Sequence, residues 1–202
     1  MYFWRFLVAG SICAAPSMAS EPVKLDSVFN IDEVSFVKQP GSATVTGTAS
    51  IKLADGTIKN CAGFNVELLP IAAYSKERIV RTYGNDQQGQ ILLEQNPPKF
   101  TPDVPEYHDT LIKGACDERG EFRFSNVSAG DYFVMAFIIW DDASGATPRK
   151  TGGAAMKRIH VAAGSQVEAH LGGGALSATT DVSDSKAFVS LFSLLADSNS
   201  HQ

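Results

Sequence analysis

The chain lacks the excess of positive charge that several binding functions require. Its 202 residues include 17 basic and 22 acidic side chains, which give a formal net charge of −5 at pH 7. Proteins that bind the phosphates of nucleic acids or of anionic lipids need a patch of lysine and arginine. No run of such residues occurs here. We therefore expect no nucleic-acid partner.

The N-terminal apolar run is well short of the about 20 residues that a membrane-spanning helix needs. Arg5 precedes an apolar stretch at residues 6–15, and small residues follow at 17–19. This order is typical of a secretory signal peptide, cleaved after Ala19; an uncleaved membrane anchor is the alternative. Cys13 does not follow the small residue that lipoprotein processing prefers. We predict a soluble periplasmic or secreted protein with no membrane span after cleavage.

Cysteine is scarce, with three residues in all, and only Cys61 and Cys116 remain after the predicted cleavage. In an oxidising compartment, two cysteines that bracket successive strands favour a disulfide over free thiols. On the chain-entropy model, closing that loop would stabilise the fold by about 4 kcal/mol. Two separately buried thiols, or a reactive or metal-binding pair, are the alternatives. A metal site would need further ligands close by in the sequence, and none is present.

Motifs of catalytic and metal sites are absent. The sequence has four histidines, at positions 108, 160, 170 and 201, and their spacing is neither His-x-His nor His-x-x-x-His. Metal ligation needs several side chains that converge within a few ångströms, so solvated or ion-paired histidines are the better interpretation. A Gly-x-Ser-x-Gly nucleophile elbow is missing as well. We therefore expect no catalytic residues, no metal site and no cofactor, and predict that the protein is not an enzyme.

Two turn-and-strand patterns occupy the middle of the chain. Residues 117–120 (Asp-Glu-Arg-Gly) have the composition of a turn. Residues 121–124 then alternate polar and apolar, which places both phenylalanines on one face of a strand. After a second turn at residues 129–131, residues 132–139 are apolar on both faces. Such a strand is central in its sheet, or is covered on its second face by a loop, a tail or a partner.

This block resembles a known family. The pattern Asp-x-x-Gly-x-Phe-x-Phe at residues 117–124, followed by Gly-Asp-Tyr at 130–132 and a hydrophobic strand, is similar to the carboxypeptidase regulatory-like domain. The likeness extends to residues 45–47, 64–68 and 157–171. It implies an all-β fold, the transthyretin-like (prealbumin-like) β-sandwich, and a non-catalytic role. Two enzyme families use related sandwiches, but neither the Tyr-Arg-Gly-Ser motif of the hydroxyisourate hydrolases nor the His-x-His pair of the intradiol dioxygenases is present.

The remaining pattern suggests how the chain is organised. We predict a signal peptide at 1–19, a leading segment at 20–42, the β-sandwich at 43–171, and a Gly-rich linker with a C-terminal tail at 172–202. The apolar run at 24–38 fits an edge strand or a short helix equally well. The clearest strand pattern lies at 43–53, where apolar and polar residues alternate. A return strand is expected at 64–69.

Residues 70–114 form an insertion that we expect to be a long surface loop, rich in proline between residues 96 and 105. Loops of this length are uncommon unless they bind something or are disordered. The insertion is therefore either a surface decoration pinned by its prolines or a loop that contacts a ligand. The candidate interaction residues in it are Phe100, Tyr107 and His108.

The end of the sandwich has a hairpin pattern. Residues 141–148 have the composition of a loop, closed by the glycines at 152 and 153. Residues 156–162 and 166–171 flank a three-residue turn signal, which predicts a β-hairpin with Val161 opposite Val167. In the tail, apolar residues occur at the spacing of a short helix, which could dock on a sheet face or bind a partner. These apolar positions are Phe188, Leu191, Phe192 and Leu195.

Together these patterns predict an exported, non-enzymatic β-sandwich module that acts through binding or structural contacts at the cell envelope. Its partner would be a protein, an envelope component or a glycan. The alternative is a small-ligand or enzymatic site near the loop at 96–108, which requires Tyr107, His108 and a charged partner to converge in a concave pocket. A third hypothesis is a subunit of an envelope assembly that inserts its apolar C-terminal segment into a neighbour.

Overall fold

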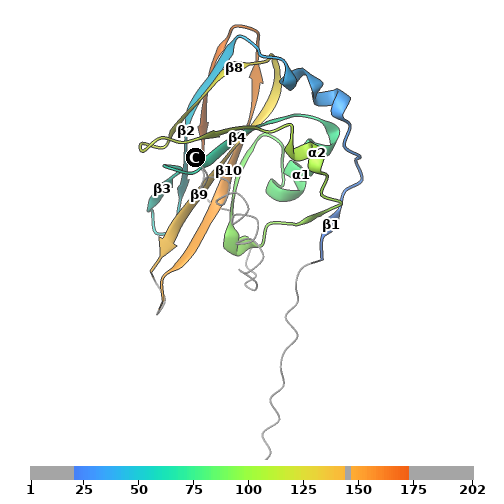
Figure 1. Ribbon diagram of the computed structural model, residues 1–202. Helices are drawn as coiled ribbons and strands as arrows, with labels where there is room; N and C mark the ends of the chain where they lie inside the picture. Colours follow the sequence, from blue (N-terminus) through green and yellow to red (C-terminus); the bar gives the residue numbers. More distant parts are fainter. Residues whose placement is uncertain (1–20, 144–146, 173–202) are drawn as a thin grey trace, which may run out of the picture.

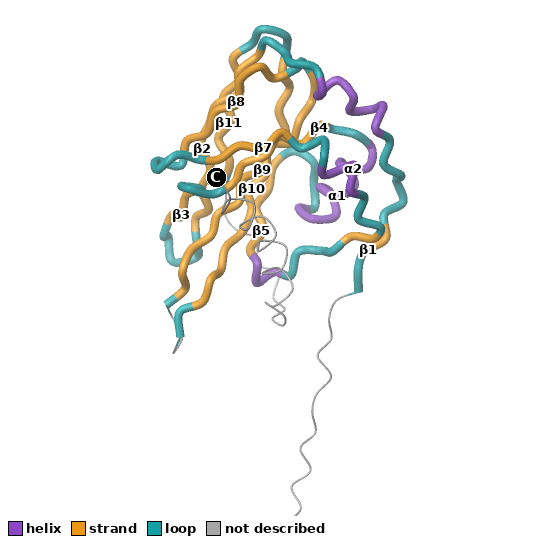
Figure 2. Tube along the Cα trace, viewed as in Figure 1, coloured by secondary structure: helices purple, strands orange, loops and turns teal. Residues whose placement is uncertain are grey.

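The computed structural model describes residues 21–143 and 147–172. The predicted signal peptide and the predicted helical spacing in the tail lie outside the described residues. Within them the protein is mainly β-structure, with two packed sheets and short helices at one side (Figures 1 and 2). The prediction of a fold dominated by a β-sandwich is confirmed.

Two sheets make the sandwich. The first has the order β5 (Gln88–Leu92), β10 (Arg149–Val161), β9 (Gly130–Asp142), β4 (Asn65–Pro70) and β7 (Ile112–Ala115), and all its pairs are antiparallel. The second is built on β2 (Ala43–Lys52), with β11 (Gln166–Leu171) parallel to it on one edge. The opposite edge of β2 pairs with β8 (Glu121–Val127) and then with β3 (Ile58–Asn60), both antiparallel.

Alternation along the strands decides which side chains enter the space between the sheets. In β2 every second residue is buried, from Ala43 to Ile51, as the pattern predicted. Phe122 and Phe124 of β8 are buried as well. They pack in one core cluster with the inner face of β9, which includes Tyr132, Val134, Ala136 and Ile138. The core between the sheets therefore comes from the alternating strands recognised in the sequence.

Strand β9 is central, because it lies between β10 and β4. Its second face is also covered. Phe133 is fully buried there, in a second cluster that joins the outer face of the sheet to the helices of the insertion. The members of this cluster are Leu25, Leu69, Tyr74, Ile79, Tyr107, Phe133 and Met156. A strand that is apolar on both faces is thus explained by layers on both of its sides.

The insertion is not a long loop, and this part of the prediction was wrong. It contains α1 (Ala73–Tyr83), η2 (Leu93–Gln95), β6 (Phe100–Thr101) and α2 (Pro105–His108), together with the sheet strands β5 and β7. Helix α1 lies over the outer face of the first sheet (Figure 1). The Ser75 hydroxyl accepts a hydrogen bond from the Ala72 N–H at 2.8 Å, and Gly84 ends the helix at φ +76°. The signal in the sequence was a stretch without glycine or proline at residues 71–83, closed by Gly84.

The predicted hairpin at 156–171 was also wrong. β10 and β11 belong to different sheets, so that Val161 pairs with Gly130 and Val167 pairs with Val45. The turn at 162–165 therefore carries the chain from one sheet to the other. The glycines at 152 and 153 lie within β10 rather than closing a loop. The alternating pattern defines the buried face of each strand but does not identify its neighbour.

The leading segment forms a short helix, which was one of the two structures that its sequence allowed. η1 (Ile31–Lys38) is a 3-10 helix whose first turn is capped by the side chain of Asn30, and β1 (Val23–Lys24) pairs with β6 in parallel. Phe36 of η1 packs edge-on against Tyr132, with ring centroids 5.8 Å apart. None of the helices in the described ranges is long and apolar enough to cross a membrane.

The predicted disulfide between Cys61 and Cys116 is confirmed. The two sulfur atoms are 1.99 Å apart and the Cα atoms 5.7 Å apart. Cys61 follows β3 of the second sheet and Cys116 follows β7 of the first sheet. Both residues are buried in the core between the sheets. The bond therefore links the two layers of the sandwich.

Candidate binding groove

The predicted interaction residues of the insertion lie around an arginine. The guanidinium of Arg78 in α1 stacks over Phe100 at 4.6 Å and over Tyr107 at 4.7 Å from the ring centroids. It also donates a hydrogen bond of 2.9 Å to Asp103, whose same oxygen lies 3.0 Å from Nε2 of His108. These contacts bind α1 to the segment that carries β6 and α2.

Tyr107 is part of a packed aromatic cluster rather than an exposed contact residue. Its ring lies 5.2 Å from that of Tyr74 and 6.1 Å from that of Phe29, both edge-on. The side chain is buried, and this burial raises the pKa of its hydroxyl above the ordinary value. Of the three candidate residues, only His108 presents a large part of its side chain to solvent. The predicted residues do converge, but they form the core beneath the insertion.

A buried carboxyl group lies close to this cluster. Glu67 of β4 is only 4% exposed, and burial raises its pKa, while the charges of Lys113 and His108 act in the opposite direction. A raised pKa means that the folded protein holds this proton more tightly than the unfolded chain does. The stability therefore falls as the pH rises from the unfolded value of 4.5 to the folded one.

Replacing Glu67 by glutamine should remove this loss. At pH 7 we expect the Glu67→Gln variant to be more stable, by about 1.4 kcal/mol for each unit by which the pKa is raised. The gain should vanish near pH 3.5, where Glu67 is protonated in both states. Urea denaturation of both proteins at the two pH values measures it. A variant that is less stable than the parent at pH 7 would contradict the assigned cost of burying the charge.

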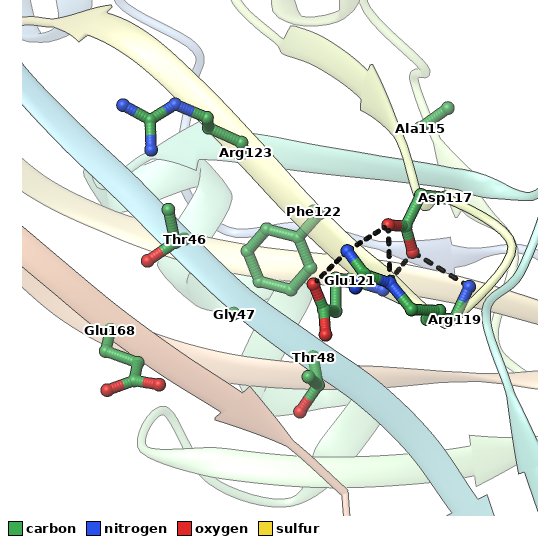
Figure 3. A pocket seen from close by; sticks show the side chains of 10 residues that line it. All are labelled: Thr46, Gly47, Thr48, Ala115, Asp117, Arg119, Glu121, Phe122, Arg123 and Glu168. Carbon is green, nitrogen blue, oxygen red and sulfur yellow. Dashed lines mark hydrogen bonds and ion pairs between the residues drawn. The ribbon is translucent and has the colours of Figure 1, made fainter.

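A different part of the surface is hollowed. An open groove with a cavity volume of about 620 Å³ lies along β2, β8 and β11, with the turn before β8 at its end (Figure 3). Its lining is largely polar and charged. The residues that line it are Thr46, Gly47, Thr48, Ala115, Asp117, Arg119, Glu121, Phe122, Arg123 and Glu168.

Strand register places the polar side chains of the groove in two rows that cross β8, β2 and β11. In one row Arg123 pairs with Thr46, and Thr46 pairs with Glu168. In the next row Glu121 pairs with Thr48, and Thr48 pairs with His170. Successive members of a row lie about 5 Å apart, which is the spacing of adjacent strands. A ligand laid across the strands would meet all three side chains of the first row. In the second row it would meet Glu121 and Thr48, with His170 just outside the lining of the groove.

Hydrogen bonds order one side of the groove. Thr48 Oγ1 lies 2.9 Å from Nδ1 of His170, and Nε2 of that ring lies 3.1 Å from a carboxylate oxygen of Glu168. Each of these three side chains therefore has a neighbour that limits its rotation. They still offer further lone pairs and donors to a bound molecule.

The turn at the other side holds one arginine between two carboxylates. Arg119 Nη2 lies 3.2 Å from Asp117 and 2.9 Å from Glu121. The backbone N–H groups of Glu121 and Arg119 donate to Asp117, and these bonds lower the pKa of that carboxyl group. Ion pairs and hydrogen bonds among its own residues therefore hold the turn together, as the dashed lines in Figure 3 show.

Gly47 allows the strands beneath the groove to pack closely. A Cβ atom at this position would lie 1.8 Å from the backbone oxygen of Ala169 and 2.7 Å from the Phe122 ring. Only glycine therefore lets β11 approach β2 this closely over the Phe122 ring. In the sequence, the signal was a glycine at an apolar position of an otherwise regular strand. It was not recognised, because the strands that lie beside it are distant in sequence.

The groove offers hydroxyl, carboxylate and guanidinium groups on an open surface. Such groups bind polar ligands through hydrogen bonds. Over residues 21–143 and 147–172, no three or more His, Cys, Asp or Glu side chains are grouped so that they could hold a metal ion. The chemistry that the lining itself offers is the recognition of a hydroxyl-rich or charged molecule.

No protein-family model matches the chain, and no curated protein matches it. A solved structure does share its fold: a crystal structure from Pseudomonas aeruginosa, described as that of a candidate carbohydrate binding protein. The two align with a TM-score of 0.59 at 20% sequence identity, over 71% of this chain and 97% of the other. At this identity the likeness shows the fold alone. The chain therefore shares its β-sandwich architecture with a protein of known structure.

Proposed function

We propose that this protein is an exported, non-enzymatic β-sandwich module that binds a carbohydrate of the cell envelope through the groove on β2, β8 and β11. One observation carries the proposal: two rows of hydrogen-bonding side chains run across β8, β2 and β11 along one open groove. Sugar hydroxyls need such a mixture of donors and acceptors. The description of the P. aeruginosa neighbour supports the same ligand class.

Two further observations support an exported module of the predicted family. The disulfide between Cys61 and Cys116 favours an oxidising compartment, in agreement with the secretory pattern of residues 1–19. The turn at 117–120 is followed by β8 and β9, which is the turn-and-strand order on which the resemblance to the carboxypeptidase regulatory-like domain rests. The transthyretin-like subtype and the limits of the sandwich at 43–171 are part of this proposal.

The alternative function at residues 96–108 has less support. It requires an accessible Tyr107, whereas this side chain is buried under Arg78 and Phe29. The residues there are engaged with one another: Asp103 binds both Arg78 and His108. These contacts favour a packing role for the insertion and leave the groove as the better binding surface.

Saccharide binding tests the proposal. The mature protein should bind one or more classes of envelope oligosaccharide on a glycan array and in calorimetry. A double variant, Thr46→Val with Glu168→Ala, should bind the same sugars at least tenfold more weakly, because it removes a hydroxyl and a carboxylate from one row. Two changes of the same chemistry at exposed Thr101 and Glu106, Thr101→Val and Glu106→Ala, are the matched control and should leave the affinity unchanged.

Two outcomes would contradict the proposal. One is a protein that binds no saccharide on a broad array. The other is saccharide binding that the groove variant retains in full, with an unchanged unfolding midpoint to show that the variant is folded. The second result would place the ligand on another face of the sandwich.

A further inference from the structure

The two arginines in the groove differ in their charge environment. Arg119 is held between Asp117 and Glu121, at 3.2 and 2.9 Å, so its charge is matched within the turn. Arg123 is exposed, and no ion pair or hydrogen bond of its side chain occurs with the other described residues. Figure 3 shows its guanidinium apart from the cluster around Arg119. The groove therefore contains one cation whose charge is not matched by a neighbour in the fold.

The carboxylates of the groove are engaged with other partners. Glu121, the nearest acidic residue on the same strand, forms its ion pair with Arg119. Glu168 lies across β2 and has an oxygen 3.1 Å from His170. Two strand spacings, about 10 Å, separate the backbones of Arg123 and Glu168. Arg123 is thus the group in this groove that is best placed to attract an anion.

Building on the proposed function, we propose that the groove binds an acidic saccharide, with the carboxylate of a uronic acid on Arg123. The planar guanidinium of arginine matches a carboxylate with two parallel hydrogen bonds. Thr46, beside Arg123 in the same row, adds a hydroxyl to the same end of the ligand. The next sugar extends toward Glu168, whose carboxylate accepts hydrogen bonds from its hydroxyls.

The negative net charge of the chain is compatible with this ligand. The formal charge of −5 is spread over the whole sequence, and at physiological ionic strength exposed charges are screened beyond about 8 Å. The contacts at Arg123 are shorter than this distance. Recognition of the acid is therefore decided locally, whereas the net charge slows its approach.

The experiment compares sugars that differ only in their carboxylate. Oligomers of glucuronate, galacturonate and mannuronate are titrated beside neutral oligomers of glucose, galactose and mannose with the same linkage. At least one acidic oligomer should bind at least tenfold more tightly than its neutral counterpart. The Arg123→Gln variant should bind that acid about 10- to 100-fold more weakly, as expected for hydrogen bonds to a charged group. Its affinity for the neutral sugar should fall far less, because the glutamine amide still donates a hydrogen bond to a hydroxyl. Arg123→Lys should lie between the two.

The control variant makes the same change in net charge elsewhere. Lys24→Gln, at an exposed position of β1, should leave the preference for the acid intact. Equal binding of acidic and neutral sugars, or a preference that Arg123→Gln retains, would overturn this inference while leaving carbohydrate binding in place. A stronger preference for sulfated oligomers over uronates would overturn the assignment of a carboxylate. A protein that binds none of these sugars, nor any other on a broad array, would overturn the proposed function itself.

Discussion

Replacing both Cys61 and Cys116 by alanine is expected to lower the free energy of unfolding by about 4 kcal/mol. The disulfide closes a loop with a sequence separation of 55, and a cross-link of this span removes much of the freedom of the unfolded chain. For a domain of this size, the loss corresponds to a melting temperature about 8 to 16 °C lower. Thermal and urea denaturation measure both quantities.

The reduced parent protein is the control for this experiment. With a strong reductant present, the parent should approach the stability of the double variant, because both then lack the covalent link between the sheets. Both cysteines are buried, so a small additional cost from the smaller alanine side chains is expected in the variant. A loss of less than 1 kcal/mol on reduction would show that the link contributes little to the stability of the sandwich.

The change Phe133→Ala should destabilise the protein by about 3 to 5 kcal/mol. Phe133 is fully buried on the outer face of the first sheet, in the cluster that includes Tyr74 and Ile79 of α1. Removing the ring deletes apolar contacts and leaves a cavity between the sheet and the helix. Urea denaturation measures the total loss. Limited proteolysis near residues 84–88, at the end of α1, should be faster in the variant, because the helix loses its packing surface.

Met135 supplies a matched comparison on the same face of the same strand. It is only partly buried at the edge of that cluster, so Met135→Ala should cost less than half as much as Phe133→Ala. Equal losses for the two variants, or no change in proteolysis for Phe133→Ala, would contradict the view that the insertion is held on the sheet by this cluster.

Some elements could be predicted in detail because their signals are local. β2 and β8 alternate with a period of two, and the predicted faces are the buried ones. The apolar character of both faces of β9 predicted a strand that is central in its sheet or covered on its second face. The structure shows both, because β9 lies between β10 and β4 and its outer face packs in the second cluster. The disulfide was predicted from the number of cysteines and the compartment, without knowledge of the distance between them.

Other elements were misjudged because the local signals were ambiguous. The prolines of the insertion suggested a loop, although β5 in its middle and β7 at its end form the two edges of the first sheet. Tyr107 was expected to be a contact residue, and Phe29 and Tyr74, from segments far away in the chain, cover it. The groove was not predicted at all, since Glu168 and Arg123 are polar residues of ordinary appearance on two separate strands.

Local sequence patterns were enough to identify β2, β8 and β9 as strands, to define the buried side of β2 and of β8, and to show the pair of cysteines available for a disulfide. These properties depend on the alternation and type of residues that are close together in the chain. Long-range packing set the remaining features: β11 pairs with β2 instead of β10, Arg78 lies among the aromatics of the insertion, and Thr46, Arg123 and Glu168 share one groove. The reason is physical: these neighbours are far apart along the chain, and the packing of whole layers brings them together, which no local period encodes.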